Sequence, residues 1–207
     1  MRDHWIKIAD ELREQMDGRH KARESALVAC RKTIQSCAKA IRSLHRQENE
    51  AARELLNEAR GLIEEARQSV RDHPDLFHAG YISDAEKEYA EGEAIYAIVL
   101  GNPVPEPGDV GVGITAYLNG MGEAASECRR YILDALRRGE LERAESVFVV
   151  MEEIYDELVT FDYPDALTGG LRRTCDALRA VLERTRGDLT MTRTQKQLEA
   201  ALAKDQE

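Results

Sequence analysis

Two pairs of glutamates stand at helical spacing in this sequence of 207 residues and have the chemistry of metal ligands. Glu88 and Glu91 are three residues apart, and Glu123 and Glu127 are four residues apart. Residues at these spacings share one face of a helix, with Cβ atoms about 5 to 6 Å apart. If the two helices are antiparallel neighbours with axes about 8 to 10 Å apart, the four carboxylates converge on a small volume. Four like charges in such a volume require a cation or bound protons.

The expected chemistry of this cluster follows from its ligand atoms, which are all oxygens. Oxygen ligands favour a hard ion such as Mg²⁺ or Mn²⁺, which keeps water ligands and accepts phosphate oxygens. Hydrolysis of a phosphodiester, with the metal activating water, is the reaction that such a cluster favours. The alternative is a pair of solvated helix faces, because these spacings recur by chance in a helical chain with 39 acidic residues. Spacing alone leaves both interpretations open.

Other motifs that carry catalytic chemistry are absent from the sequence. No histidine follows a glutamate by three residues, which excludes the ExxH motif of di-iron bundles. The motifs GxxxxGK[ST], GxSxG and HExxH do not occur. The four cysteines form no CxxC pair and are interpreted as buried small side chains rather than as disulfide or zinc partners; they are Cys30, Cys37, Cys128 and Cys175.

A basic strip is expected near the N-terminus of an otherwise acidic chain. The net charge is −10, yet residues 1–47 hold 11 basic and 6 acidic residues, and residues 25–47 hold no acid. Apolar residues recur there at alternating three and four, which indicates a helix with one buried face. The basic side chains fall elsewhere on the helix, where they form either a solvated face or a surface for an anion or a nucleic acid. They are Arg31, Lys32, Lys39, Arg42 and Arg46, with His45 beside them.

The composition, together with the positions of capping residues, glycines and prolines, predicts an all-α protein in a single domain over residues 1–207. Charged residues make up 33% and aromatic residues only 5%, which favours helices with solvated outer faces. Helices are expected to about residue 47, then over 49–70, 83–101, 114–138, 140–159 and 165–186, with a seventh after 192. A capping box at Ser83 and Glu86 is expected to open the third, and Gly187 to end the sixth. No signal peptide or membrane span is recognisable, so a cytoplasmic protein is expected.

Several segments of the sequence resemble the translin family, and specifically its translin-associated factor X branch. They are EYAE at residues 88–91, AYLNGM at 116–121 followed by EAASECRR at 123–130, IRSLHR at 41–46, and LERTRGD at 182–188. Their order and spacing match the family over roughly residues 20 to 190. The resemblance implies an all-α fold of about seven helices that assembles into hollow shells, usually octamers, and binds single-stranded RNA or DNA.

The factor X branch is a Mg²⁺-dependent endoribonuclease that uses four acids, two on each of two helices. By position, the resemblance assigns both catalysis and metal binding to Glu88, Glu91, Glu123 and Glu127. Glu123 stands where aspartate is common, so its carboxylate reaches further by one methylene. The resemblance assigns nucleic-acid binding to Arg31, Lys32, Lys39, Arg42, His45 and Arg46.

Three hypotheses remain open from the sequence. The first is a Mg²⁺- or Mn²⁺-dependent endoribonuclease that cleaves single-stranded RNA with low sequence specificity, since aromatic residues are too few for a stacking platform along the strip. The second is a shell that binds single-stranded RNA or DNA without catalysis, as in the translin branch. The third is a structural bundle whose basic strip pairs with acids of neighbouring subunits.

Overall fold

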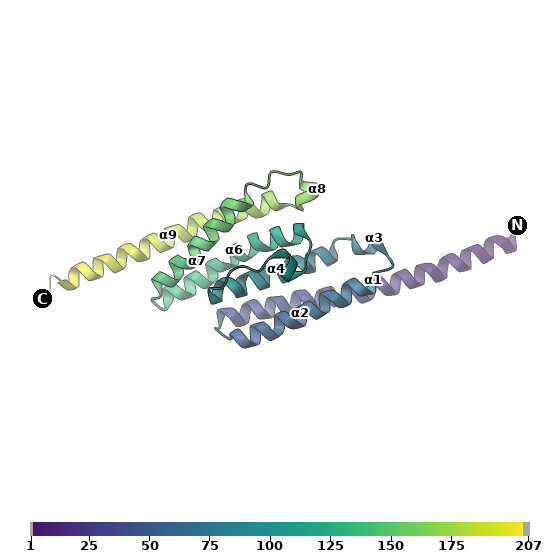
Figure 1. The fold of residues 1–207 in the computed structure, drawn as a ribbon, viewed down its shortest axis with the longest axis horizontal. Helices are drawn as coiled ribbons and strands as arrows, with labels where there is room; N and C mark the ends of the chain where they lie inside the picture. The colour runs from purple at the N-terminus through teal and green to yellow at the C-terminus, as the bar shows by residue number, and fades with distance from the viewer. Residues whose placement is uncertain (1, 205–207) are drawn as a thin grey trace.

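The computed structural model describes residues 2–204, which are helical and contain no strand (Figure 1). Six helices of 18 residues or more build the body, and three helices of four residues lie in the connections. Their bounds are α1 Arg2–His45, α2 Asn49–Ser69, α3 Pro74–Phe77, α4 Tyr81–Leu100, α5 Pro107–Val110, α6 Ile114–Arg137, α7 Leu141–Leu158, α8 Asp165–Thr168 and α9 Leu171–Lys204.

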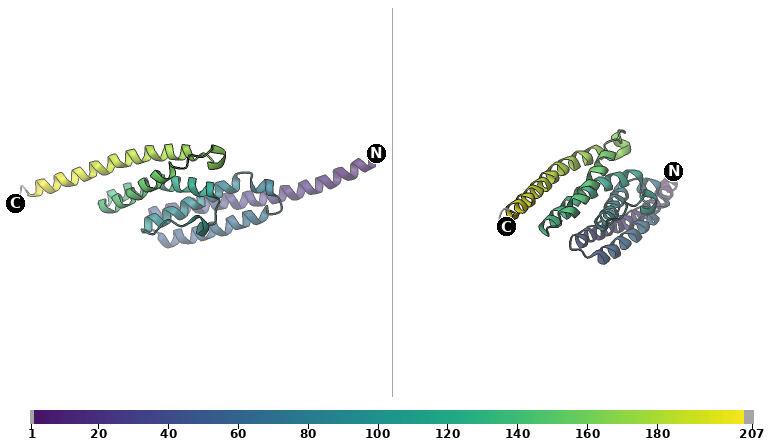
Figure 2. Two further views of the ribbon diagram at one scale, coloured as in Figure 1. Left: turned by 45° about the horizontal axis from the view of Figure 1, so that its top comes forward. Right: turned by 60° about the vertical axis from the view of Figure 1, so that its left-hand side comes forward.

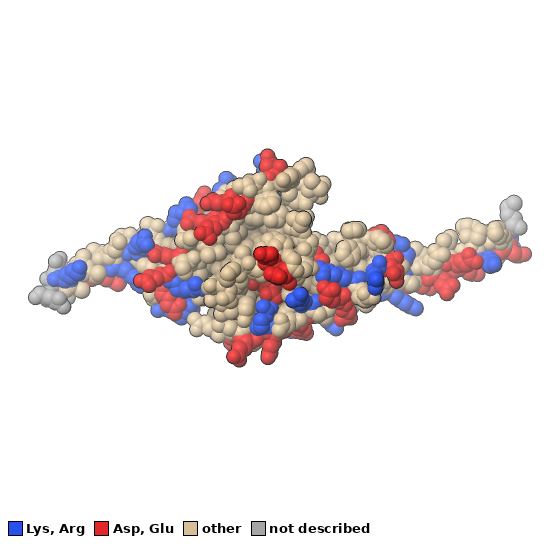
Figure 3. Space-filling model, viewed as in Figure 1, with Lys and Arg blue, Asp and Glu red and all other residues tan. Residues whose placement is uncertain are grey.

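The long helices pack in pairs along one direction. α1 and α2 form a hairpin that packs on α4, α4 packs on α6, and α6 packs on α7 and α9. The first turns of α1 and the last turns of α9 extend beyond this body at opposite ends of the molecule (Figures 1 and 2). Acidic and basic side chains are interspersed along the projecting part of α1 (Figure 3). None of the helices in residues 2–204 combines the length and apolar character that a bilayer span requires.

Apolar side chains between the helices form two main clusters. The first joins α1, α2, α4 and α6 through buried residues that include Leu44, Leu56 and Ile95. The second joins α6, α7 and α9 through residues that include Ile132, Met151 and Leu178. α6 contributes to both clusters, and Ile98 of α4 also reaches the second, so these two helices connect the two halves of the molecule.

α4 and α6 approach each other closely at Gly120. A Cβ atom at Gly120 would lie 2.8 Å from the backbone oxygen of Lys87 and 2.9 Å from the Cβ atom of Ala90. Real Cβ atoms essentially never come so close to another heavy atom. Glycine and alanine therefore bring the two backbones together next to the glutamates that each helix carries.

The all-α fold class is confirmed, and so is the interpretation of the cysteines. All four cysteines are buried and free. The predicted helices over 49–70, 114–138 and 140–159 match α2, α6 and α7 to within one residue at each end. The predicted domain of residues 1–207 includes residue 1 and residues 205–207, which lie outside the described residues.

The predicted capping box at Ser83 was wrong. α4 begins two residues earlier, at Tyr81, after Gly80 with a φ of 95°. Glu86 does not fold back on the start of the helix but accepts hydrogen bonds from Arg67 and from the backbone N–H of Gly113. The Glu86 carboxylate, which a capping box would require, is therefore paired with Arg67 of another helix.

The predicted helix ends near Asp165 and Gly187 were also wrong. α8 stops after one turn, and Gly169 and Gly170, with φ values of 58° and 88°, separate it from α9. α9 then continues through Gly187, although a glycine inside a helix costs about 1 kcal/mol. Leu182 and Leu189 are buried on either side of it, so packing on α6 and α7 outweighs the cost.

Replacement of Gly120 by alanine is expected to force α4 and α6 apart and to lower the free energy of unfolding by about 1–3 kcal/mol. The matched control is Gly61→Ala in α2, where a Cβ atom would meet nothing within 4 Å. That control is expected to raise stability by up to about 1 kcal/mol, since alanine favours the helix. Urea denaturation of both variants measures the difference. Equal stability of the two variants would contradict the close contact.

Candidate metal centre and nucleic-acid interface

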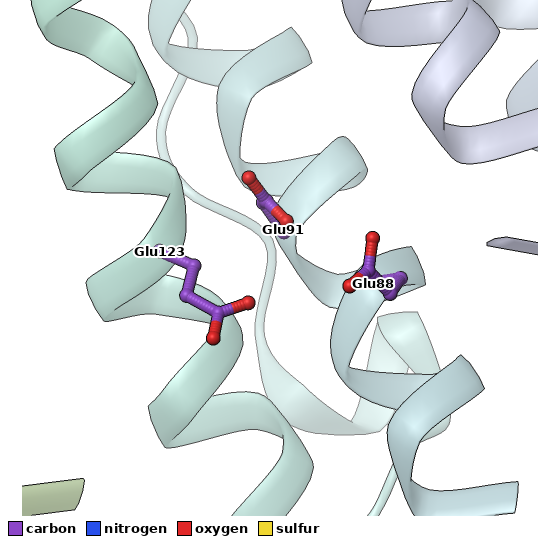
Figure 4. Close-up of side chains that lie close together, drawn as sticks. All are labelled: Glu88, Glu91 and Glu123. Carbon is purple, nitrogen blue, oxygen red and sulfur yellow. The ribbon is translucent and has the colours of Figure 1, made fainter. Parts of the chain in front are cut away.

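Three of the four predicted acidic residues come together between α4 and α6. One carboxylate oxygen from each of Glu88, Glu91 and Glu123 lies within 4.8 Å of the others. Figure 4 shows the Glu123 side chain on α6 extending toward Glu88 and Glu91 on α4. We refer to these three residues as the acidic cluster.

The local sequence explains why the carboxylates converge. Glu88 and Glu91 share one face of α4 because they are three residues apart. Glu123 follows Gly120 by three residues on α6, so it lies one turn from the point of closest approach. The close contact of the two backbones thus brings glutamates of two different helices within reach of a shared ligand.

The acidic cluster holds more negative charge than its surroundings accommodate. Burial, followed by the neighbouring charges of Glu88, Glu123 and Glu127, raises the pKa of Glu91 from 4.5 to about 8. The pKa of Glu88 is also raised, first by burial, even though Lys87 acts against the shift. Burial is the larger cause of both shifts, and the charges of neighbouring carboxylates add to it.

Lys87 is a partner of the acidic cluster that the sequence analysis missed. Its Nζ atom donates to both carboxylate oxygens of Glu123, at 2.6 and 2.7 Å, and lies 3.9 Å from Glu88 Oε1. Burial lowers the pKa of Lys87, but the hydrogen bond and charge of Glu123 outweigh burial and raise it. A sequence signal existed, because Lys87 precedes Glu91 by four residues and so shares its helix face.

Glu127 is held outside the acidic cluster by His45. Glu127 Oε1 lies 2.7 Å from His45 Nε2, which is at the C-terminal end of α1. Glu88, Glu91 and Glu123 each place a carboxylate oxygen within 4.8 Å of the others, and Glu127 is not part of that group. The predicted four-carboxylate site is therefore three carboxylates with a fourth on its border.

The placement of His45 corrects one predicted member of the basic strip. The His45 side chain is only 4% exposed and contacts Glu127 rather than solvent. Its Nδ1 atom is buried and has no hydrogen-bond partner among the described residues. His45 therefore belongs to the border of the acidic cluster.

The other five basic residues form a continuous stripe along α1 and the turn that follows it, where Arg46 lies. At 100° per residue, their positions fall within an arc of about 100° on the side opposite the buried residues. All five are exposed. Arg46 pairs with Glu48 at 2.8 Å, whereas the remaining four form no ion pair with any residue in the described range. In the structure the basic strip therefore consists of four residues rather than the six predicted. They are Arg31, Lys32, Lys39 and Arg42.

The donor set of the acidic cluster fits a hard divalent cation. Its ligand atoms are carboxylate oxygens from residues that are partly exposed, and the three carboxylates lie close together. Octahedral Mg²⁺ holds oxygens at about 2.1 Å, which places ligand atoms about 3 to 4 Å apart. The three oxygens, within 4.8 Å of one another, are close to that spacing.

Comparison with solved structures identifies the family. The chain is similar to AfC3PO, at 31% identity and a TM-score of 0.83, over 90% of this chain and 97% of that one. The chain belongs to the translin family. A structure of AfC3PO in complex with duplex RNA matches over 90% of this chain and 96% of that one, at 31% identity with a TM-score of 0.80.

Two further matches extend this comparison. NeC3PO has the same translin-family fold at 20% identity, with a TM-score of 0.81, over 89% of this chain and 96% of that one. The uncharacterized protein MJ0175 of Methanocaldococcus jannaschii is 32% identical over 111 residues, which are 53% of this chain and 50% of that protein. The match therefore spans half the length of this curated relative. No protein-family model matches the chain.

The raised pKa of Glu91 predicts a pH dependence of stability. In protein freed of divalent ions, the folded state keeps a proton that the unfolded state releases between pH 4.5 and about 8. The stabilisation is therefore complete below pH 4.5 and is lost as the pH rises to about 8. Each pKa unit corresponds to about 1.4 kcal/mol, so the loss is of the order of a few kcal/mol.

Glu91→Gln is expected to remove this loss, because a neutral amide does not titrate. Thermal or urea unfolding of chelator-treated protein across that pH range is the measurement. The control is Glu54→Gln on the exposed side of α2, which should keep the wild-type dependence. A Glu91→Gln protein with the wild-type slope would contradict the buried, crowded carboxylate.

Proposed function

We propose that this chain is a Mg²⁺- or Mn²⁺-dependent endoribonuclease of the translin-associated factor X type, which cleaves single-stranded RNA with low sequence specificity. The observation that carries the proposal is the convergence of Glu88, Glu91 and Glu123 from two helices on one small volume. The family relationship, through AfC3PO and its complex with duplex RNA, supports RNA as the ligand.

In this proposal the acidic cluster holds the divalent ion, and Glu127 completes its border. The chemistry that a divalent ion held there would supply is activation of a water molecule and stabilisation of the charge on the phosphodiester. Glu88, Glu91 and Glu123 fix its position, while His45 fixes the orientation of Glu127 through the 2.7 Å contact. Cytoplasmic RNA is the proposed substrate pool.

The basic strip supports the nucleic-acid part of the proposal. Arg31, Lys32, Lys39 and Arg42 are exposed and carry positive charge that no described residue neutralises. The strip runs along α1 toward His45, which contacts Glu127 at the acidic cluster. Phosphate contacts along this exposed face of α1 would hold a strand on the protein, and such contacts carry little sequence preference.

Self-association into a homo-oligomer is part of the proposal. The projecting part of α1 exposes Trp5 and Met16, which are 62% and 63% accessible, and the projecting part of α9 exposes Leu198 at 59%. An isolated helix with apolar side chains in water is stabilised by packing against a partner. The resemblance to the family points to an octamer.

The alternative is a translin-like shell that binds single-stranded RNA or DNA without cleaving it. Two contacts favour it: the ammonium group of Lys87 already neutralises Glu123, and His45 holds Glu127 away from the other acids. In such a protein the acidic cluster would be satisfied without a divalent ion.

The first test is cleavage of a labelled single-stranded RNA by the purified chain. Cleavage is expected with Mg²⁺ or Mn²⁺ and none with EDTA. Glu123→Ala and Glu91→Ala are expected to lower the cleavage rate about 100-fold or more. Each removes a carboxylate that is proposed to bind the metal ion directly. Glu54→Gln, on an exposed face of α2, serves as the control. Unchanged cleavage by Glu123→Ala would remove the acidic cluster from the mechanism, and duplex RNA in parallel tests the strand preference.

The second test concerns the basic strip and uses binding in EDTA, where no cleavage occurs. Each phosphate contact on a single strand contributes about −0.7 to the slope of log K against log salt. Lys39→Gln combined with Arg42→Gln is therefore expected to reduce that slope by about 1.4 units. Arg184→Gln on α9 is the control. The Arg184 guanidinium donates a hydrogen bond to the Ala180 carbonyl of the same helix. An unchanged slope in the double variant would exclude the strip as the RNA contact.

A further inference from the structure

A cavity of about 340 Å³ lies beside the acidic cluster; Glu123 belongs to both, and Lys87, which bonds Glu123, also lines the cavity. Its walls come from the starts of α4 and α6 and from the turn between α8 and α9. This volume is within the range of small-ligand pockets in proteins. The cavity is therefore adjacent to the place where the proposed reaction occurs and is large enough for part of a substrate.

Hydrogen bonds fix one wall of the cavity in position. Thr115 Oγ1 donates to the Leu167 carbonyl and Asn119 Nδ2 to the Thr168 carbonyl, each at 2.8 Å. Thr174 Oγ1 donates to Asn119 Oδ1, also at 2.8 Å. The amide of a buried asparagine thus ties the turn and the first residues of α9 to α6. The wall is formed before any ligand arrives.

Arg173 supplies the cavity with a positive charge that no residue in the described range pairs with. Its Nη2 atom lies 3.2 Å from the position that a Cβ atom would take at Gly170. The guanidinium group therefore occupies the space that a side chain at Gly170 would fill. A planar guanidinium group with free N–H donors is suited to bidentate binding of a phosphate.

The remaining charges of the cavity select among anions. Asp84 and Glu123 also line it, so a small free anion meets repulsion as well as the attraction of Arg173. Asp84, together with Ser83, instead offers hydrogen-bond acceptors for the hydroxyl groups of a ribose. A phosphate that carries a ribose matches this combination better than phosphate alone.

We propose that this cavity binds the nucleotide next to the phosphodiester that the acidic cluster cleaves, with Arg173 paired to the phosphate of that nucleotide. This inference rests on the proposed function, since it places the nucleotide relative to the cleaved bond. It assigns Arg173 to substrate binding and not to the chemistry of bond cleavage.

The test compares Arg173→Gln with Arg172→Gln in the full chain. Both arginines are exposed on adjacent positions of α9, but Arg172 lines a different cavity, on the side of α7. Binding of a labelled single-stranded RNA in EDTA is expected to weaken about tenfold in Arg173→Gln and less than twofold in Arg172→Gln. With Mg²⁺, Arg173→Gln is expected to raise KM with little change in kcat.

A direct readout locates the contact. Modification by phenylglyoxal, measured by mass spectrometry on the wild-type chain, should be blocked by RNA at Arg173 but not at Arg172. Equal protection of the two arginines, or equal binding by the two variants, would overturn the inference even if the chain cleaves RNA. Absence of cleavage by the wild-type chain with Mg²⁺ would instead overturn the proposed function, whatever the two variants show.

Discussion

The close contact between α4 and α6 at Gly120 is the constraint on which the site depends. With any other residue at this position, a Cβ atom would lie 2.8 Å from the Lys87 carbonyl, and the helices would separate. Glu123 lies one turn beyond Gly120, and Glu88 and Glu91 lie beside the carbonyl it contacts. A shift of about 1 Å between the helices therefore changes the spacing of all three carboxylates, because they are divided between the two backbones.

This packing carries an electrostatic cost that the surrounding residues partly offset. The pKa of Glu91 is raised to about 8 mainly by burial, and charges on the same and the facing helix add to the effect. Lys87 neutralises Glu123, and His45 fixes Glu127 at the border. Lys87 lowers the pKa of both Glu88 and Glu91 only in part, so both carboxylates keep a raised pKa. Carboxylates kept crowded in a stable fold are typical of sites selected for function rather than for stability.

The sequence predicted features that local chemistry determines and missed those that distant contacts determine. The ends of α6 follow from Gly113 and Gly139, which lie next to them in the chain, and both were predicted. The continuation of α9 through Gly187 depends on packing against α6 and α7, which no local pattern contains. The bond between His45 and Glu127 joins residues 82 apart, so helical periodicity places both residues on faces but cannot pair them.

Lys87 competes with any cation that would bind Glu123 in the acidic cluster. Its ammonium group already donates to both oxygens of Glu123, and a divalent ion that binds those oxygens must displace it. The exchange replaces one positive charge by two, so it is favourable where Glu88 and Glu91 are also ionised. A displaced Lys87 remains a wall residue of the Arg173 cavity, where its charge would add to that of Arg173. If such an ion binds, its occupation of the acidic cluster would strengthen the attraction of the cavity for a phosphate through this single side chain.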